Sequence, residues 1–350
     1  MCRTIITALT TALTTALFLT IFFLGGVLCA WGDNAALDFV NQARKANKLP
    51  LLHLQSQLEK AADNHALYMA QHNLIDHEEH AGLDNFTGNR CLERITHTGY
   101  QAAICIENLS FGQKNWLESA QQLMSGIYHR MGFLAFDVDE IGLACRAASQ
   151  SGKKLFYNYV MGNSVLRKMC EGSPSRKGYA NVCVDKDRVI GKALFEQHNE
   201  DLAQNSGYVV LYPWPDQINV PPHFHNAEIP NPLPGIKLSG QPVSVHFNPV
   251  RLRGKTMTMV SFRLSDAAGQ DVSLLPVKDK QSDPRFSEYD FAWFPEKVLE
   301  GGHTYRVSLD GIAGGQSFTM DWAFTTAEIP FSWAKKHENV LVMNRPKSTF

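Results

Sequence analysis

This sequence lacks an excess of either positive or negative charge. Its 350 residues hold 33 Lys and Arg against 34 Asp and Glu, a formal net charge of -1, and the basic residues are dispersed along the chain. A protein that binds DNA or RNA through the phosphate backbone needs clustered Lys and Arg. The composition therefore excludes nucleic acid as an expected partner.

The common motifs of hydrolytic and metal-dependent enzymes are also missing. The chain has no G-x-S-x-G element, no catalytic-cysteine signature and no zinc-type C-x-x-C pair. The stretch LIDHEEHAG contains His77 and His80, which are closer together than the histidines of the helical zinc-protease motif. If His77 has a chemical role, its partners lie elsewhere in the sequence. His80, Glu78 and Glu79 are interpreted as a solvated rim.

The N-terminus has the features of an export signal. Arg3 precedes a long apolar run, which gives way to small residues near Cys29 and Ala30. This pattern predicts a signal peptide over residues 1–30 and a mature chain that begins close to Ala30 or Trp31. An uncleaved membrane anchor is the alternative, because the run approaches the length of a spanning helix. We expect a secreted, periplasmic or cell-envelope protein that contacts membrane only through this segment.

The cysteines that would remain after cleavage are odd in number. One thiol would then stay free unless it pairs between molecules. Proximity in the sequence favours Cys91 with Cys105 and Cys170 with Cys183, although other pairings are open. Cys145 lies in the apolar run IGLAC and is interpreted as a buried thiol rather than a nucleophile. Export makes such disulfides permissible.

Hydrophobic spacing divides the chain into a mixed part and a β-rich part. It predicts helices from Asp33 to about Arg44, from Leu54 to Met69, where His65 would be a hydrogen-bonded core residue, and from Trp116 to Ser125. DEIGLACRAA and KLFYNYVMG then read as a hairpin joined by SQSGK. From Gly207 onward, short alternating runs separated by Gly, Pro and Asp predict an all-β sandwich.

We therefore expect an α+β chain with two folded units, since its length exceeds what one core usually serves. The predicted segments are a signal peptide at 1–30, a mixed domain at 33–163, a connector with a Cys170–Cys183 pair at 164–206, a β-sandwich at 207–328 and a tail at 329–350.

Four blocks of the mixed domain carry a family resemblance. They are LEKAADNHALYMAQHNLIDH (58–77), ERITHTGYQAAICIENLSFG (93–112), SGIYHRMGFL (125–134) and DEIGLAC (139–145). In this order and at these spacings they resemble the CAP superfamily of cysteine-rich secretory proteins, insect antigen 5 and plant pathogenesis-related proteins. The region from 207 resembles bacterial Ig-like domains through YPWPDQINVPPHF, GGHTYRVSLDG and WAFTT.

The resemblance implies an α-β-α sandwich whose cleft is lined by His77, Glu107 and His129. Two imidazoles and a carboxylate can hold zinc or another divalent cation with one coordination position open. The same trio can instead polarise a substrate, with Glu107 orienting or deprotonating an imidazole. A third reading is a buried hydrogen-bonded pair of Glu107 and His129 that only fixes the cleft walls. Ser125 and Arg130 are further candidate cleft residues.

One departure from the family concerns a second glutamate, which eukaryotic members often carry and which falls here at Gly126. Its absence weakens the expected metal site and the case for hydrolysis. We therefore expect an extracellular or envelope binding module for a lipid, a peptide or a cell-envelope glycan. The alternative is a metal-assisted peptidase or esterase that uses the same cleft.

Overall fold

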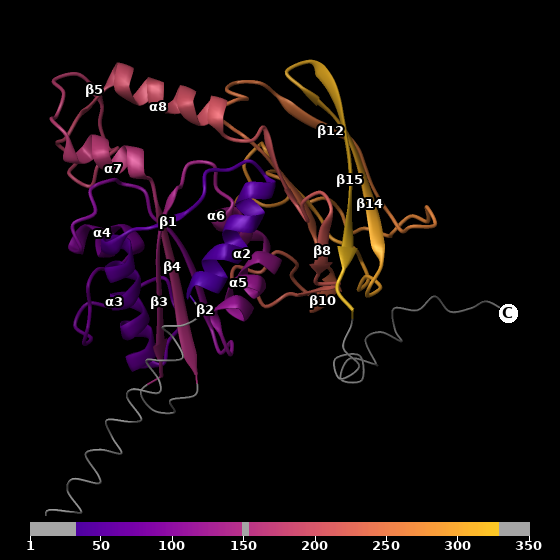
Figure 1. Cartoon of the computed structure of the whole chain (residues 1–350), viewed down its shortest axis with the longest axis horizontal. Helices are drawn as coiled ribbons and strands as arrows, with labels where there is room; N and C mark the ends of the chain where they lie inside the picture. Colours follow the sequence, from indigo (N-terminus) through magenta and orange to yellow (C-terminus); the bar gives the residue numbers. More distant parts are fainter. Residues whose placement is uncertain (1–32, 149–153, 329–350) are drawn as a thin grey trace, which may run out of the picture. The chain divides into compact units, whose positions relative to one another are not determined.

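The computed structural model describes residues 33–148 and 154–328 (Figure 1). The predicted signal peptide, the SQSGK turn and the C-terminal tail lie outside the described residues. The chain divides into two compact units by its internal contacts. Of the described residues, the first unit takes 33–41, 52–123, 138–148 and 154–194, and the second takes 42–51, 124–137 and 195–328.

The helices are α2 (Asp33–Ala46), α3 (Ser56–His72), α4 (Cys91–His97), α5 (Trp116–Ser125), α6 (Ile127–Phe133), α7 (Ser164–Glu171) and α8 (Lys192–Asn205). The strands are β1 (His53–Leu54), β2 (Ile106–Phe111), β3 (Glu140–Ala147), β4 (Leu155–Gly162), β5 (Gly178–Tyr179), β6 (Ile190–Gly191), β7 (Val209–Tyr212), β8 (Gln217–Val220), β9 (His223–His225), β10 (Leu238–Gly240), β11 (Val243–Phe247), β12 (Met257–Ser265), β13 (Asp290–Trp293), β14 (Thr304–Ala313) and β15 (Gln316–Thr326).

The first unit is built on a four-stranded sheet in the order β1-β3-β4-β2, in which β4 runs antiparallel to both of its neighbours. Successive side chains of a strand point to opposite faces. Phe156 of β4 packs with Met69 of α3, whereas the ring of Tyr157 meets Trp116 of α5 at 5.1 Å between centroids. Helices therefore cover both faces, which confirms the predicted α-β-α layers.

Helix α3 lies along β3 and β4 (Figure 1) because its apolar residues recur at helical spacing. The Gln55 side chain accepts a hydrogen bond from the Leu58 N–H at its start, and Asn73 ends it in the left-handed conformation. The approach to β3 is close. A Cβ added to Gly142 would lie 2.0 Å from the carbonyl carbon of Leu58, so only glycine fits beneath this helix.

Two disulfides join the pairs that sequence proximity favoured, Cys91 with Cys105 and Cys170 with Cys183. The interpretation of Cys145 as a buried thiol is wrong. Cys145 is disulfide-bonded as well. Burial in an apolar run does not distinguish a thiol from a disulfide, because both are compact and apolar.

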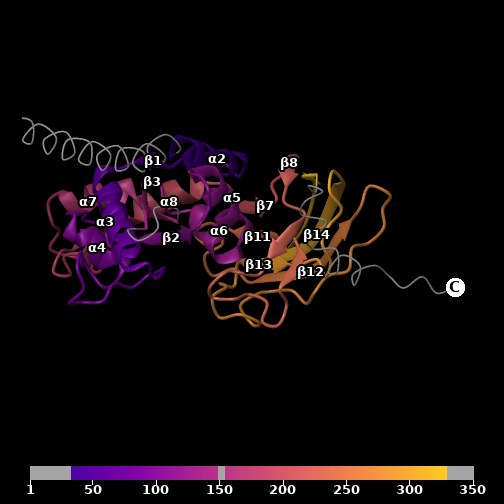
Figure 2. The ribbon, with the colours of Figure 1, turned by 90° about the horizontal axis from the view of Figure 1, so that it is seen from below.

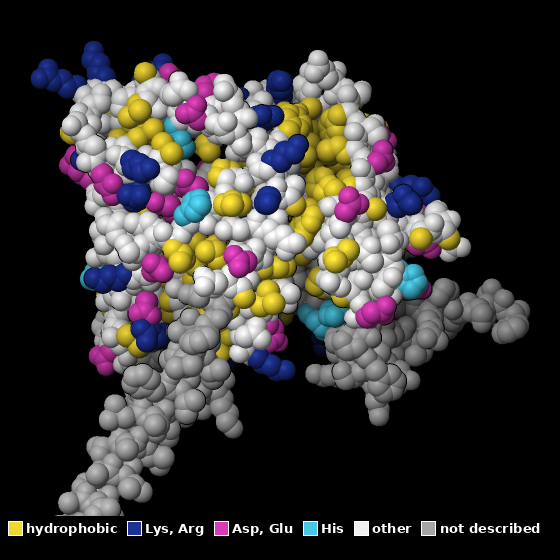
Figure 3. All heavy atoms as spheres, in the orientation of Figure 1, with side chains coloured by type: hydrophobic (Ala, Val, Ile, Leu, Met, Phe, Trp, Pro, Cys, Tyr) yellow, Lys and Arg dark blue, Asp and Glu magenta, His cyan; other side chains and the backbone are white. Residues whose placement is uncertain are grey.

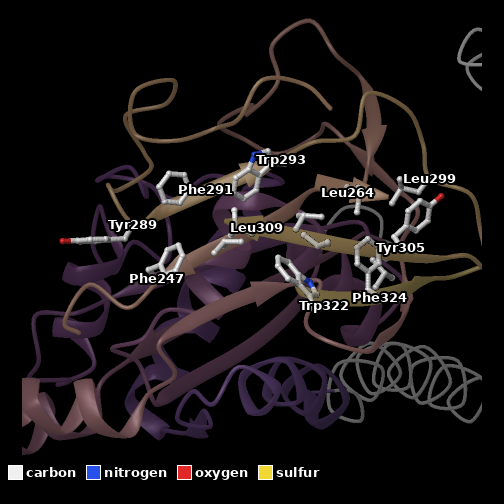
Figure 4. Close-up of a cluster of buried hydrophobic side chains, with 14 of the residues drawn as sticks. Phe247, Leu264, Tyr289, Phe291, Trp293, Leu299, Tyr305, Leu309, Trp322 and Phe324 are labelled. Carbon is white, nitrogen blue, oxygen red and sulfur yellow. The ribbon is translucent and has the colours of Figure 1, made fainter. Parts of the chain in front are cut away.

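The second unit contains a three-stranded sheet in the order β13-β11-β7 and a four-stranded sheet in the order β12-β14-β15-β8. Figure 2 shows β11 and β13 of the first sheet beside β12 and β14 of the second. The side chains between them form one apolar cluster, drawn in Figure 4. It includes Phe247 and Trp293 from the three-stranded sheet, and Leu309, Trp322 and Phe324 from the four-stranded sheet. The predicted all-β character of this region is confirmed, and its likeness to Ig domains stays a prediction.

The short helix α6 is part of the second unit. Ile127 at its first position is fully buried in a cluster with Phe224, Phe286 and Phe294. Its orientation is therefore fixed by side chains that follow it by about a hundred residues or more in the sequence. This arrangement matters for His129, which lies on the same helix.

The surface carries charges of both signs. Figure 3 shows Lys and Arg interspersed with Asp and Glu over one face. Among the described residues, no helix is long and apolar enough to cross a membrane.

Candidate functional site

His77 follows α3 and is held by a glutamate on β2. Its Nδ1 lies 2.9 Å from Oε2 of Glu107, and the His77 side chain is 52% exposed whereas that of Glu107 is 4% exposed. A carboxylate only accepts hydrogen bonds, so Nδ1 must be the donor. The neutral ring then carries its lone pair on Nε2. Two of the three predicted cleft residues are thus brought together as an oriented pair.

Both carboxylate oxygens of Glu107 accept hydrogen bonds from neighbouring side chains. The Arg94 guanidinium donates from Nη2 to both of its oxygens at 2.9 and 2.8 Å, and Asn158 donates to Oε1 at 3.3 Å. Burial alone would raise the pKa of Glu107, but the hydrogen bond from His77 and the charge of Arg94 lower it to about 2. A carboxylate with such a low pKa is a poor general base at neutral pH. In this state Glu107 can orient His77 through the hydrogen bond to Nδ1.

A second buried pair supports the same segment. His65 is fully buried, with Nδ1 at 2.9 Å from Glu79 Oε1 and Nε2 at 2.9 Å from the Asp76 carbonyl oxygen. The predicted core role of His65 is confirmed, but the interpretation of Glu79 as a solvated rim residue is wrong. Glu79 is 0% exposed and also accepts the N–H groups of Thr87 and Gly88. Burial raises its pKa, and the bonds from His65 and Thr87 lower it further than burial raises it.

His129, the third predicted residue, is paired with a glutamate that sequence reasoning missed. Its Nδ1 lies 2.8 Å from Oε1 of Glu228, whose side chain is 2% exposed against 17% for His129. The same carboxylate accepts the backbone N–H groups of Ile127 at 2.8 Å, Tyr128 at 2.7 Å and His129 at 3.0 Å. No spacing rule could have found Glu228, because it is 99 residues from His129.

Arg130 and Ser125 tie α6 into the second unit. Arg130 is fully buried and donates to the carbonyl oxygens of Met124 and Ser125 and to Oγ of Ser244, with its guanidinium 3.9 Å from the ring centroid of Tyr212. Burial lowers its pKa to about 10. The Ser125 hydroxyl donates to Oε1 of Gln241 at 2.9 Å. Both side chains anchor the helix, and a buried guanidinium of this kind is not placed to meet an anion in solvent.

A metal ion would need more ligands than either histidine pair offers. In residues 33–148 and 154–328, no group of three or more His, Cys, Asp or Glu side chains is arranged to hold one. Glu107 accepts two N–H contacts on each oxygen, which fills the lone pairs of a carboxylate, whereas Glu228 accepts three on Oε1 and one on Oε2. The Glu107 carboxylate therefore does not fit as a metal ligand. The single cleft predicted for His77, Glu107 and His129 stays a prediction, as does the zinc or other divalent ion.

Comparison with known proteins bears on this geometry. A model of the cysteine-rich secretory protein family, CAP, matches residues 37–163. The chain contains a CAP domain. All four sequence blocks lie inside the match, so the resemblance they carry is confirmed. His77, Glu107 and His129 belong to the CAP domain by sequence, whereas Glu228 lies outside it. No curated protein matches the chain.

Three solved structures are similar to part of the chain. An outer surface protein from Borrelia burgdorferi is 18% identical with a TM-score of 0.32, over 37% of this chain and 90% of that one. An extracellular protein with an SCP domain from Bacillus anthracis is 19% identical with a TM-score of 0.31, over 37% of this chain and 40% of that one. The CAP domain of enterococcal PrgA is 16% identical with a TM-score of 0.26, over 47% of this chain and 70% of that one.

Proposed function

We propose that the protein is an exported binding module whose CAP domain recognises a lipid, a peptide or a cell-envelope glycan through His77. The observation that carries this proposal is the pairing of a half-exposed imidazole with a buried, donor-saturated carboxylate. Fixing Nδ1 as the donor makes Nε2 an acceptor of defined direction. Such a group suits a hydroxyl or amide N–H of a ligand.

The state of Glu107 favours binding over hydrolysis. A general base should have a pKa near the working pH and reach the proton that it takes. Glu107 has a pKa of about 2, and its oxygens already accept bonds from Arg94, Asn158 and His77. The disulfides support export, because such bonds persist in oxidising compartments.

Native mass spectrometry of the full secreted chain tests the ligand. We expect a co-purified lipid, peptide or glycan in the parent and its loss in His77→Ala, with His80→Ala as the matched control because His80 is exposed in the same segment. Adding zinc to the same samples tests the ion predicted from the resemblance. A ligand retained equally by the parent and by His77→Ala would contradict the proposed role of His77.

A hydrolysis assay separates this proposal from the enzyme alternative. We expect no turnover of a peptide and ester library by the parent, because the one carboxylate bound to His77 stays ionised and fully hydrogen-bonded. Turnover that disappears in Glu107→Gln and persists in Glu78→Gln would contradict the binding proposal and support the hydrolase alternative.

A further inference from the structure

The carboxylate of Glu228 binds the side chain of His129, a contact that capping of the helix alone does not require. Glu228 comes from the segment between β9 and β10, and its Oε1 accepts both the N–H and the Nδ1–H of His129. We propose that Glu228 is a positioning residue, supplied from outside the family-matched region, that holds His129 in the Nδ1–H tautomer with Nε2 as its acceptor atom.

The local sequence leaves the cap of α6 to a residue from outside the helix. The residue before α6 is Gly126, in an extended conformation with φ -68° and ψ 153°. A Ser, Asp or Asn at this position would cap the helix by accepting an N–H of the first turn. Glycine provides no such side chain but leaves room for Glu228. A Cβ at position 126 would lie 2.8 Å from Oε1 and 3.0 Å from Cδ of that residue.

The segment that carries Glu228 is itself held in place. Asn226 donates from Nδ2 to the side-chain oxygen of Asn231 and to the carbonyl oxygens of Leu233 and Ile236, each at 2.6 Å. Leu233 also packs in the cluster that buries Ile127 at the start of α6. The carboxylate is thus presented by a fixed loop. This is the condition under which a hydrogen bond to Nδ1 defines the direction of a ring.

Electrostatics permits the buried charge. An isolated buried carboxylate is costly unless donors or an opposite charge compensate it. Three backbone N–H groups and the imidazole donate to Glu228. Burial lowers the pKa of Arg130, and its electrostatic interactions with Tyr212 and Glu228 raise it in part. The arrangement repeats the one at His77, where Glu107 holds Nδ1 and Arg94 supplies the positive charge.

The consequence is that the C-terminal region contributes to the chemistry of the CAP domain. His129 keeps a defined acceptor atom only while residues after 206 are folded around α6. The value of this orientation for ligand recognition rests on the proposed function. The orientation itself does not, so the two are tested separately.

The test is long-range ¹H–¹⁵N NMR of the histidine rings in the full chain at about pH 8.5, well above the ordinary histidine pKa of about 6.5. The His129 signals are assigned by their loss in His129→Gln. In the parent, Nδ1 should resonate as a protonated nitrogen and Nε2 as an unprotonated one. Finding the reverse pattern in the parent would overturn the proposal without any variant.

Two variants extend the test. Glu228→Ala removes the acceptor, and Gly126→Ala displaces the carboxylate sterically while its backbone angles remain ordinary for alanine. Both should shift the His129 Nδ1 resonance toward the unprotonated position. Glu300→Ala is the matched control, because Glu300 forms an exposed pair with His303, and it should leave His129 unchanged. A folded Glu228→Ala protein with parent-like His129 signals would show that Glu228 is a structural cap only. Neither result depends on whether a ligand binds at His77.

Discussion

Buried carboxylates in this protein are compensated by N–H donors rather than by solvent. Glu107 and Glu228 each accept a hydrogen bond from one imidazole Nδ1 and further hydrogen bonds from other N–H groups. The same group that costs free energy to bury therefore fixes the direction of a histidine ring. At the scale of single residues, the hydrogen bonds that compensate a buried carboxylate are also the ones that orient the histidine ring.

The loss of Arg94 should lower the stability of the first unit. It is 1% exposed and pairs with Glu107, and it also donates to the carbonyl oxygens of His77, Gly88 and Asn89. Arg94→Met would leave Glu107 buried without its cation, at an expected cost of about 3 to 5 kcal/mol in the free energy of unfolding.

Urea denaturation checks this value. Arg90→Met is the control, because the Arg90–Glu78 pair is exposed and should contribute less than about 1 kcal/mol. Equal losses in the two variants would mean that burial of the Arg94 pair has no energetic consequence.

At the scale of elements, the contact between α3 and β3 depends on one missing side chain. A methyl group at position 142 would lie 2.2 Å from the backbone nitrogen of Glu59 and 2.0 Å from the carbonyl carbon of Leu58. Backbone atoms cannot rotate away as a flexible side chain can. Gly142→Ala should therefore lower the free energy of unfolding by about 1 to 3 kcal/mol or more, the usual effect of overpacking.

Thermal unfolding of the full chain measures this change. Gly191→Ala is the matched control, since the nearest atom to its added Cβ is 3.7 Å away in the Ser175 side chain, and its effect should stay within about 0.5 kcal/mol. A Gly142→Ala protein as stable as the control would show that α3 can shift without loss.

At the scale of the whole molecule, acid should destabilise the protein through its buried carboxylates. The pKa of Glu107 falls from 4.5 to about 2 on folding, so its contribution is fully present above pH 4.5 and is lost as the pH falls toward 2. At about 1.4 kcal/mol for each pH unit, this residue alone accounts for roughly 3 kcal/mol. The pKa of Glu79 is also lowered, so it acts in the same direction.

Urea unfolding at a series of pH values between about 5 and 2 measures the loss. The slope should be smaller in Glu107→Gln, which cannot titrate, than in the parent. Identical slopes would show that Glu107 has no shifted pKa in the folded state.

The sequence alone located part of the elements, and the family resemblance implied the α-β-α layers. The spacing of apolar residues located α3, Trp116 and Ser125 mark both ends of α5, and the hairpin runs became β3 and β4. These features are local, because a helix face or a strand pair is fixed by neighbours a few residues apart. The four motif blocks identified the CAP domain, and the family resemblance then pointed to His77, Glu107 and His129.

Only the tertiary structure decided what each of these side chains meets. Glu79 looked like its exposed neighbours but is buried against His65, and Glu228 reaches His129 across 99 residues. Local spacing carries no information on either contact, since both depend on where the chain returns after folding. The empty position at Gly126 looked like a loss in the sequence, yet in the folded chain it is the space that the Glu228 carboxylate requires.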